Sequence, residues 1–222
     1  RYVPKFETGG TFGVNMHTAN DRLFSFNYES IYASDEARTK NHETFVLNHY
    51  LKQFNTESIA TRNFDHCGEP CAIACKKFVG EYKKDYEPYQ ALGPNCGIYD
   101  QRAAEMINKY VDTMGADAIT MGGMVSWIME LIREKLLPEN IFSYPQGTYN
   151  FKFSDTESGF DVVDDSMNNA KLAKEIVDLI IFKPEGEMFR MGIREAAKKL
   201  DSETGARTID RAVFKKKKKK GC

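Results

Sequence analysis

Apolar residues follow a helical spacing over much of this chain, and the pattern is sharpest between residues 100 and 133. Side chains three and four positions apart share one face of an α-helix, so two consecutive helices are predicted there. Asp100 and Asp117 stand where N-cap residues belong, and Gly115 between them is a natural helix stop. The apolar stripes are Ala103, Ala104, Ile107, Tyr110, Val111 and Met114 in the first helix, and Met121, Met124, Val125, Ile128, Leu131 and Ile132 in the second.

Further helices are predicted on both sides of this pair, while convincing strands are not. Ser34 followed by two acidic residues predicts a helix start, and this helix should run to about Gln53. Because no stretch alternates apolar and polar residues in the manner of a strand, the fold class is predicted to be mainly α. The other helices are expected at residues 71–78, 168–182 and 188–200, and connectors or irregular loops at residues 55–64, 85–98 and 139–166.

Charge and length place further limits on the chain. Its 222 residues suffice for one large domain or two smaller ones, and we expect a helical domain over residues 1–137 and the start of the next over 138–205. Residues 206–222 are polar, contain six consecutive lysines at 215–220, and are expected to be a disordered tail. The rest of the chain is acidic, which argues against a nucleic-acid partner.

The ends and the apolar runs of the sequence bear on its location. No run of about 20 apolar residues is present, so we expect no membrane span, and no signal peptide opens the chain. The chain begins with Arg1 and not with Met, which is typical of a fragment. Three of the five cysteines are crowded into nine residues, unlike a secreted disulfide framework, so a cytoplasmic protein is expected.

This cysteine stretch, Cys67-Gly-Glu-Pro-Cys71-Ala-Ile-Ala-Cys75, is the strongest chemical signal in the sequence. On a helix, its spacing of four residues places three thiolates on one face. Thiolates suit a soft metal centre, either zinc or an iron–sulfur cluster, and His66 beside the stretch is a possible fourth ligand. The plain alternative is three buried thiols that pack as small apolar side chains.

Several other residues are candidates for a site or for the scaffold. The glycines of Thr8-Gly-Gly-Thr-Phe-Gly13 allow positive φ angles or close approach to a ligand, although a simple turn explains them equally well. Gly122 and Gly123 weaken their helix by about 1 kcal/mol each relative to alanine, so we expect the backbone there to approach another helix or a cofactor. His42 and His49 lie at helical spacing with apolar residues and are expected to be scaffold.

Three motifs follow one another along the chain. The first is Thr8-Gly-Gly-Thr-Phe-Gly13, and the second runs from Thr61-Arg-Asn-Phe64 through the cysteine stretch to two lysines. The third comprises Tyr86-Glu-Pro-Tyr89, Gly93-Pro94 and Asp112-Thr-Met-Gly-Ala-Asp117. Over about residues 6–200 this series resembles the tungsten-containing aldehyde:ferredoxin oxidoreductase family. The Cys-Gly-Glu-Pro-Cys form is most similar to the branch that contains glyceraldehyde-3-phosphate:ferredoxin oxidoreductase and the tungsten subunit of benzoyl-CoA reductase.

The resemblance implies a fold, cofactors and roles for individual residues. It implies the helical second domain and the start of the third domain of that family's catalytic subunit. A [4Fe–4S] cluster would take Cys67, Cys71 and Cys75 as three of its four ligands, and Glu87 would be the general acid/base. A tungsten (or molybdenum) bis-pterin would be held partly by a loop that matches Asp112, Gly115 and Asp117. The substrate would be a small aldehyde, and ferredoxin or another electron-transfer subunit would accept the electrons.

The sequence also departs from the family pattern. The loop that would supply the fourth cluster cysteine is missing, as is the N-terminal pterin-binding domain, and Cys222 lacks the context of a ligand. Residues after about Arg207 look foreign to the family. We therefore expect a fragment that is inactive alone. The tungsten subunit of an aryl-CoA (benzoyl-CoA) reductase and a non-enzymatic iron–sulfur or zinc helical module remain alternatives, and whether Cys96 or His17 approaches the metal stays open.

Overall fold

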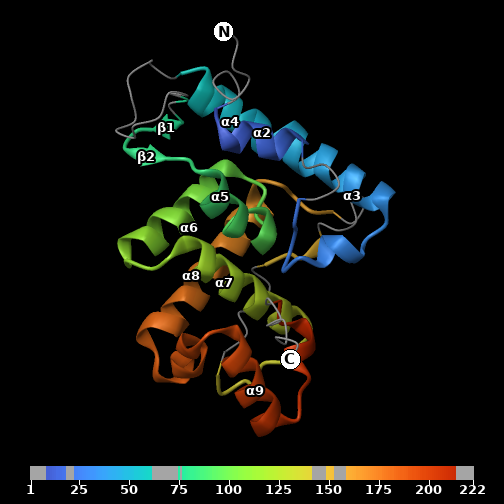
Figure 1. Ribbon diagram of the computed structural model, residues 1–222, viewed down its shortest axis with the longest axis vertical. Coiled ribbons are helices and arrows are strands. Elements are labelled where there is room, and N and C mark those ends of the chain that lie inside the picture. The colour runs from blue at the N-terminus through green and yellow to red at the C-terminus, as the bar shows by residue number, and fades with distance from the viewer. Residues whose placement is uncertain are drawn as a thin grey trace, which may run out of the picture.

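The fold was taken from a computed structural model, which describes residues 9–18, 23–61, 75, 77–141, 149–152 and 159–213. Helices form nearly all of the regular structure in these ranges, and the sheet found there has two short strands. The prediction of a mainly α chain is confirmed. Figure 1 shows three levels of helices, from α2 and α4 at the top, through α5 to α8, to α9 at the bottom.

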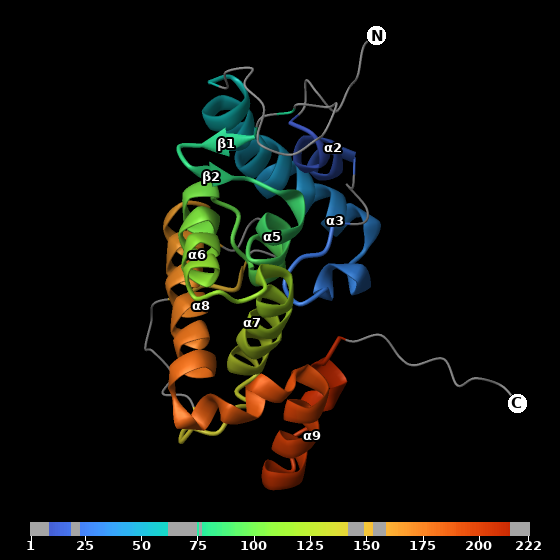
Figure 2. The same ribbon diagram turned by 60° about the vertical axis from the view of Figure 1, so that its left-hand side comes forward.

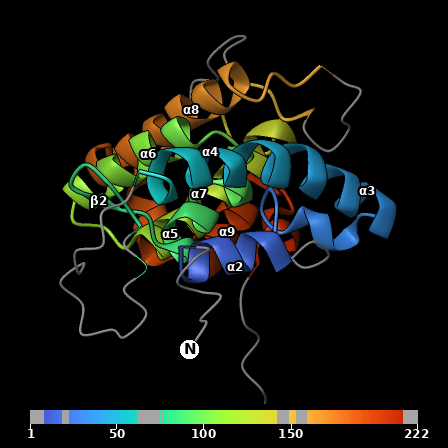
Figure 3. The same ribbon diagram turned by 90° about the horizontal axis from the view of Figure 1, so that it is seen from above.

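The upper level is one long helical segment with a shorter helix beside it. Ser34 begins the long segment as predicted, because its hydroxyl oxygen accepts a 3.2 Å hydrogen bond from the Ala37 backbone N–H. Viewed from above, helix α2 lies alongside this segment (Figure 3). The segment comprises α3 (Asp35–Asn41), the π-helical η2 (His42–Leu51), α4 (Lys52–Phe54) and the π-helical η3 (Asn55–Ile59), and α2 is Thr11–Thr18.

The predicted end of this helix near Gln53 is wrong by about one and a half turns. Phe54 and Ser58 are both fully buried, so residues that looked like a polar connector still have an inward face. The Ala60 N–H donates to the Asn55 carbonyl oxygen at 2.8 Å, which closes the last wide turn. Tertiary burial therefore extends the helix beyond the point at which its apolar pattern fades.

The central level contains the two helices that the sequence predicted most clearly. Asp100 and Asp117 cap them as expected, and every one of Ala103, Ala104, Ile107 and Val111 is fully buried. Helix α6 packs on α8, and α7 packs on both α5 and α8 (Figure 2). The elements are α5 (Tyr86–Ala91), the 3-10 turn η4 (Pro94–Cys96), α6 (Gln101–Thr113), α7 (Ala118–Arg133) and α8 (Asp164–Phe182).

Two connecting stretches differ from the prediction. Strands β1 (Phe78–Val79) and β2 (Tyr82–Lys83) form an antiparallel hairpin, so a helix over residues 71–78 is wrong at its C-terminal end. Residues 71–74 and 76 lie outside the described residues. The stretch 85–98, expected to be irregular, contains α5 and η4. Lys84, directly after β2, is 1% exposed; its ammonium lies 3.3 Å from the Glu105 carboxylate and donates a hydrogen bond to Gln101.

The lower level is built from the end of the chain. Trp127 of α7 is fully buried there, with its ring edge-on to Phe189 and its indole N–H donating to the Thr208 carbonyl oxygen at 3.3 Å. The last helix was predicted to begin at residue 188, but α9 begins at Ile193, because a 3-10 segment occupies the residues before it. The elements of this level are η6 (Pro184–Met191), α9 (Ile193–Thr204) and η7 (Thr208–Arg211). One further 3-10 turn, η1 (Glu29–Tyr32), lies near the start of the chain, before α3.

Part of the predicted tail lies within the described residues. Residues 206–213, part of the predicted tail, are described, and Thr208 among them is fully buried. The six lysines lie outside the described residues. Among the helices of the described ranges, none has the length and apolar character needed to cross a membrane.

The two adjacent glycines of α7 have different surroundings, and this yields a first prediction. A Cβ on Gly122 would lie 2.6 Å from the Ala91 carbonyl carbon of α5, whereas a Cβ on Gly123 would meet nothing within 4 Å. We expect Gly122→Ala to lower the free energy of unfolding by about 2 kcal/mol or more, because α5 must move. Gly123→Ala is the matched control, and we expect it to raise the free energy of unfolding by up to about 1 kcal/mol through helix propensity. Equal urea midpoints for the two variants would contradict this packing.

Candidate functional site

The cysteine stretch is represented in the described residues by Cys75 alone. Cys67 and Cys71 lie outside them, as does His66, so their predicted ligand roles stay predictions. Cys75 is half-buried and unpaired. Its sulfur faces Gly10: a Cβ built on Gly10 would lie 2.9 Å from the Cys75 Sγ, and Gly10 has a φ of +68°. The glycine turn of the first motif therefore lies directly against the last cysteine of the second.

Lys77, two residues further on, is buried next to the same turn. Its side chain is 6% exposed, and its ammonium lies 2.8 Å from an oxygen of Asp85 and 3.2 Å from the Thr11 hydroxyl. The same ammonium lies within 3.9 Å of the position that a Cβ on Gly10 would take. The sequence placed this lysine at a helix end, and nothing in the pattern indicated that it would be buried.

The Asp112–Asp117 loop is the turn between α6 and α7. Gly115 has a φ of +68°, and the Ala116 and Gly115 N–H groups donate to the Val111 and Asp112 carbonyl oxygens at 3.2 and 2.9 Å. These two bonds are the Schellman pattern of a helix end, which glycine favours because it has no Cβ. Asp117 then starts α7 by accepting a 2.6 Å hydrogen bond from the Thr120 N–H.

The carboxylates of this turn differ in their partners. Hydrogen bonds from the Thr120 side chain and backbone lower the pKa of Asp117, so it is ionised at neutral pH. Asp112 is exposed on the last turn of α6. Helix capping accounts for Gly115 and Asp117, but the side chain of Asp112 has no structural role that the described contacts explain. An exposed carboxylate is suited to accept hydrogen bonds from a ligand's N–H groups.

Glu87 lies in the first turn of α5 and is exposed. The adjacent Tyr86 is half-buried, and burial together with the charge of Glu87 raises the pKa of its phenol. Tyr86 is therefore a protonated hydrogen-bond donor next to an accessible carboxylate. The pattern placed Glu87 in an irregular loop, whereas the helix fixes its backbone.

Cys96 and His17 lie in different surroundings. Cys96 is fully buried, and its thiol donates to the Ala91 carbonyl oxygen at 3.2 Å, with the Gly122 carbonyl oxygen at 3.7 Å. Burial raises the pKa of this thiol well above its usual value, so it stays neutral. These contacts support the reading of Cys96 as a structural thiol between α5 and α7. His17 is exposed on α2.

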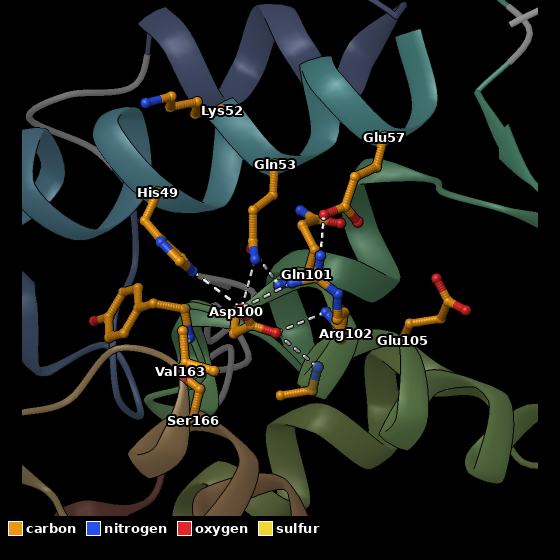
Figure 4. A network of polar contacts seen from close by, with 12 residues as sticks. His49, Lys52, Gln53, Glu57, Asp100, Gln101, Arg102, Glu105, Val163 and Ser166 are labelled. Atoms are coloured by element: carbon orange, nitrogen blue, oxygen red, sulfur yellow. Dashed lines mark hydrogen bonds and ion pairs between the residues drawn. The ribbon is translucent and has the colours of Figure 1, made fainter. Parts of the chain in front are cut away.

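A buried polar network fixes the start of α6 (Figure 4). The Asp100 carboxylate is 1% exposed, lies 3.0 Å from His49 Nε2 and accepts a 2.6 Å hydrogen bond from Gln53. Its other oxygen accepts the Arg102 and Ala103 N–H groups at 2.9 and 3.2 Å. The upper helical segment is thus joined to α6, the helix that carries Asp112.

Both histidines of the upper segment are part of the scaffold. His49 holds Asp100, as described above. His42 is 2% exposed, its Nε2 lies 2.7 Å from the Met16 carbonyl oxygen, and burial lowers its pKa. Since a carbonyl only accepts, this nitrogen carries the proton and joins η2 to α2. The prediction that both histidines are scaffold agrees with these contacts.

The described candidate residues remain separate in this part of the protein. Asp112, Gly115 and Asp117 share one turn, whereas Cys75 and Glu87 lie on other elements. Among the residues that the structure describes, no group of three His, Cys, Asp or Glu side chains is arranged to hold a metal ion. The parts nevertheless suit the implied groups: Cys75 offers a soft donor beside a cation, and the α6–α7 turn offers carboxylate oxygens to a pterin edge.

Comparison with known proteins defines the family. Residues 3–215 match the family described as aldehyde ferredoxin oxidoreductase, domains 2 and 3, and the chain belongs to this family. It is 38% identical over 206 residues to glyceraldehyde-3-phosphate:ferredoxin oxidoreductase of Pyrococcus furiosus. The aligned stretch covers 90% of this chain and 30% of that protein. Tungsten-containing aldehyde ferredoxin oxidoreductase of Pyrococcus horikoshii is 29% identical over 128 residues, covering 54% of this chain and 21% of that protein.

A third relative has no function in its name. An uncharacterized protein of Methanocaldococcus jannaschii is 32% identical over 203 residues, covering 90% of this chain and 32% of its own length. The chain thus spans about a third of the first relatives that it matches. The expectation that residues after about Arg207 are foreign to the family is wrong as far as residue 215, where the match ends.

Proposed function

We propose that this chain acts as part of a longer tungstopterin oxidoreductase that converts an aldehyde to a carboxylic acid and passes the electrons to ferredoxin. Membership of the aldehyde ferredoxin oxidoreductase family supports this proposal. The observation that carries the proposal is the α6–α7 turn, where helix ends hold Asp117 ionised and present Asp112 with no structural partner among the described residues. In the proposal, residues 1–137 form the helical domain with this site and residues 138–205 begin the next domain.

Each candidate residue has a defined task in this proposal. Asp112 and Asp117 accept hydrogen bonds from the N–H groups of one pterin, and Gly115 gives the turn its shape. Cys75, with Cys67 and Cys71, holds a [4Fe–4S] cluster, and a partner segment outside this sequence supplies the fourth ligand. When bound, the tungsten pterin and the cluster supply the two-electron oxidation and the path of single electrons outward.

Glu87 is the proton acceptor in the proposed reaction. Oxidation of an aldehyde to an acid takes its second oxygen from water, releases two electrons to two ferredoxin molecules and releases protons. A carboxylate oxygen of Glu87 receives a proton from this water, and its position on α5 keeps it accessible. Tyr86, protonated and half-buried beside it, can orient the water or the aldehyde oxygen.

A metal analysis and an activity assay of the full-length parent protein test this function together. Purified without oxygen, it should contain iron and tungsten (or molybdenum) and reduce ferredoxin when small aldehydes, including glyceraldehyde-3-phosphate, are supplied. Zinc without iron would contradict the proposal and favour a structural zinc module. Reduction of benzoyl-CoA by reduced ferredoxin, with no aldehyde oxidation, would replace the aldehyde assignment by the aryl-CoA one.

A further inference from the structure

A cavity lies where the start of the long upper segment meets the stretch of chain before it. Its volume is about 220 Å³, and η1, α3 and the first residue of η2 contribute to its wall. Because a cavity of about 150 Å³ can hold one benzene molecule, this one has room for an aromatic ring with a small substituent. None of the described residues assigned above to the cluster, the pterin or the proton transfer lines it. Its apolar lining consists of Leu23, Phe26, Tyr32, Ala33 and Ala37.

Two side chains that line the cavity each have a buried polar atom without a hydrogen-bond partner among the described residues. These atoms are Nδ1 of His42 and Nε of Arg38. His42 is 2% exposed, and its Nε2–H donates to the Met16 carbonyl oxygen, so Nδ1 has a lone pair that can accept. The Nε–H of Arg38 can only donate. Since a buried polar atom without a partner is unfavourable, the two atoms indicate a ligand that pairs with them.

One chemical group can serve both atoms. Arg38 and His42 are four residues apart in one helical segment, where the His42 backbone N–H donates to the Arg38 carbonyl oxygen, so their side chains lie one turn apart on the same face. A hydroxyl group donates through its O–H to Nδ1 of His42 and accepts at its oxygen from the Nε–H of Arg38. A carboxylate or an aldehyde oxygen only accepts, and would leave His42 without a partner.

The two charged side chains on the wall each have a partner of opposite charge. The Arg38 guanidinium forms an ion pair with Asp35. The Glu29 carboxylate accepts hydrogen bonds of 2.6 and 3.2 Å from Arg133. A charged ligand would have to compete with these pairs, whereas a neutral one would not. The cavity therefore favours a neutral ligand.

The backbone that presents Phe26 to the cavity is strained. Phe26, Asn27 and Tyr28 have φ angles of +41°, +48° and +65°, in the left-handed region that side chains disfavour. This turn is held in place because the Phe26 and Asn27 N–H groups donate to the carbonyl oxygens of Pro94 and Asn95 at 3.0 and 2.9 Å. Backbone strain of this kind is concentrated at ligand-binding and catalytic sites, which supports a binding role for the cavity.

We propose that this cavity binds a small, neutral molecule with an aromatic ring and a hydroxyl group. The ring packs among Leu23, Phe26 and Ala37, and the hydroxyl group pairs with His42 and Arg38. Tyr32, which is 86% exposed, forms the outer edge of the site. Binding here does not depend on the oxidoreductase chemistry proposed above, so either can fail without the other.

Phenol and toluene are matched probes, because they share the ring and differ in the hydroxyl group. Isothermal titration calorimetry of the full-length parent protein should show one phenol bound per chain, with a Kd of about 0.1 mM. Toluene should bind about tenfold more weakly or less, since it leaves both polar atoms unpaired. Equal affinity for the two probes would overturn the recognition of a hydroxyl group. No binding of phenol would indicate a cavity that holds only water, and would overturn the proposal.

Two variants of the wall locate the bound phenol. Arg38→Met removes the donor, and should weaken phenol binding about tenfold while leaving toluene binding nearly unchanged. Arg207→Met is the matched control, because Arg207 also forms an ion pair with an aspartate three residues away but does not line the cavity, and it should bind phenol as the unchanged protein does. Ala37→Leu fills the cavity from an exposed position and should abolish binding of both probes.

The remaining outcomes also decide the proposal. Phenol binding that survives Ala37→Leu would place the ligand elsewhere and overturn the assignment of this cavity. Phenol binding that is equal in Arg38→Met and Arg207→Met would overturn the role of Arg38. Circular dichroism shows whether each variant is folded, and if Arg38→Met is not, the comparison of phenol with toluene and the result for Ala37→Leu still decide.

Discussion

Replacing Glu87 by Gln should lower the rate of aldehyde oxidation by the full-length parent protein by about 100-fold or more. Proton transfer by a positioned carboxylate contributes about 10²- to 10⁴-fold to a rate, and the amide cannot accept the proton. Glu87 is exposed in the first turn of α5, so the substitution removes a charge and leaves the helix intact. Iron and tungsten contents should not change, because Glu87 holds neither group in the proposed arrangement.

Glu36→Gln is the matched control for this experiment. Glu36 is also an exposed glutamate in the first turn of a helix, α3, and it has no place in the proposed site. We expect its turnover to equal that of the unchanged protein. If both variants keep full turnover, Glu87 is not the proton acceptor, and the assignment taken from the resemblance fails while the cluster and pterin assignments stand.

Asp100→Ala should be the most destabilising single substitution at the polar network of the 222-residue chain. Removing the carboxylate leaves His49 and Gln53 without their acceptor and uncaps α6 at the same time. Loss of one partner of a buried charged cluster costs about 3 kcal/mol or more. Urea unfolding measures the loss, and Asp117→Ala is the control, because Asp117 caps an equivalent helix from an exposed position and should cost only about 1 kcal/mol.

The pH dependence of this loss gives a second readout. Burial alone would raise the pKa of Asp100, but hydrogen bonds from His49, Gln53, Ala103 and Arg102 outweigh it and lower the pKa to about 2, from an ordinary value of 3.8. The ionised form is therefore favoured by the fold, and its contribution of about 2 kcal/mol is present above pH 4 and disappears as the pH falls toward 2. The difference in the free energy of unfolding between the unchanged chain and Asp100→Ala should therefore shrink by this amount as the pH falls from 4 toward 2. A constant difference from pH 6 to pH 2 would show that Asp100 acts by packing and not by charge.

Local sequence signals predicted the helices of the central level well. Asp100, Gly115 and Asp117 were identified as caps and a stop because a cap acts on backbone groups two or three residues away, so the signal lies within one turn of chain. The apolar stripes of α6 and α7 could be read for the same reason, since 3.6-residue periodicity is a property of the segment itself. The boundaries failed where burial by distant elements took over, as at Ser58 in η3.

The sequence by itself determined a mainly α chain, the family and the residue types that the proposed chemistry needs. Only the tertiary structure decided that Gly10 lies against Cys75, that Gly122 lets α7 approach α5, and that Lys77 is buried while Lys83 is not. The residues that meet in this way are far apart in the sequence; Gly10 and Lys77, for example, are separated by 67 positions. Burial and charge proximity depend on how separate elements pack, and no local pattern of polar and apolar residues records that packing.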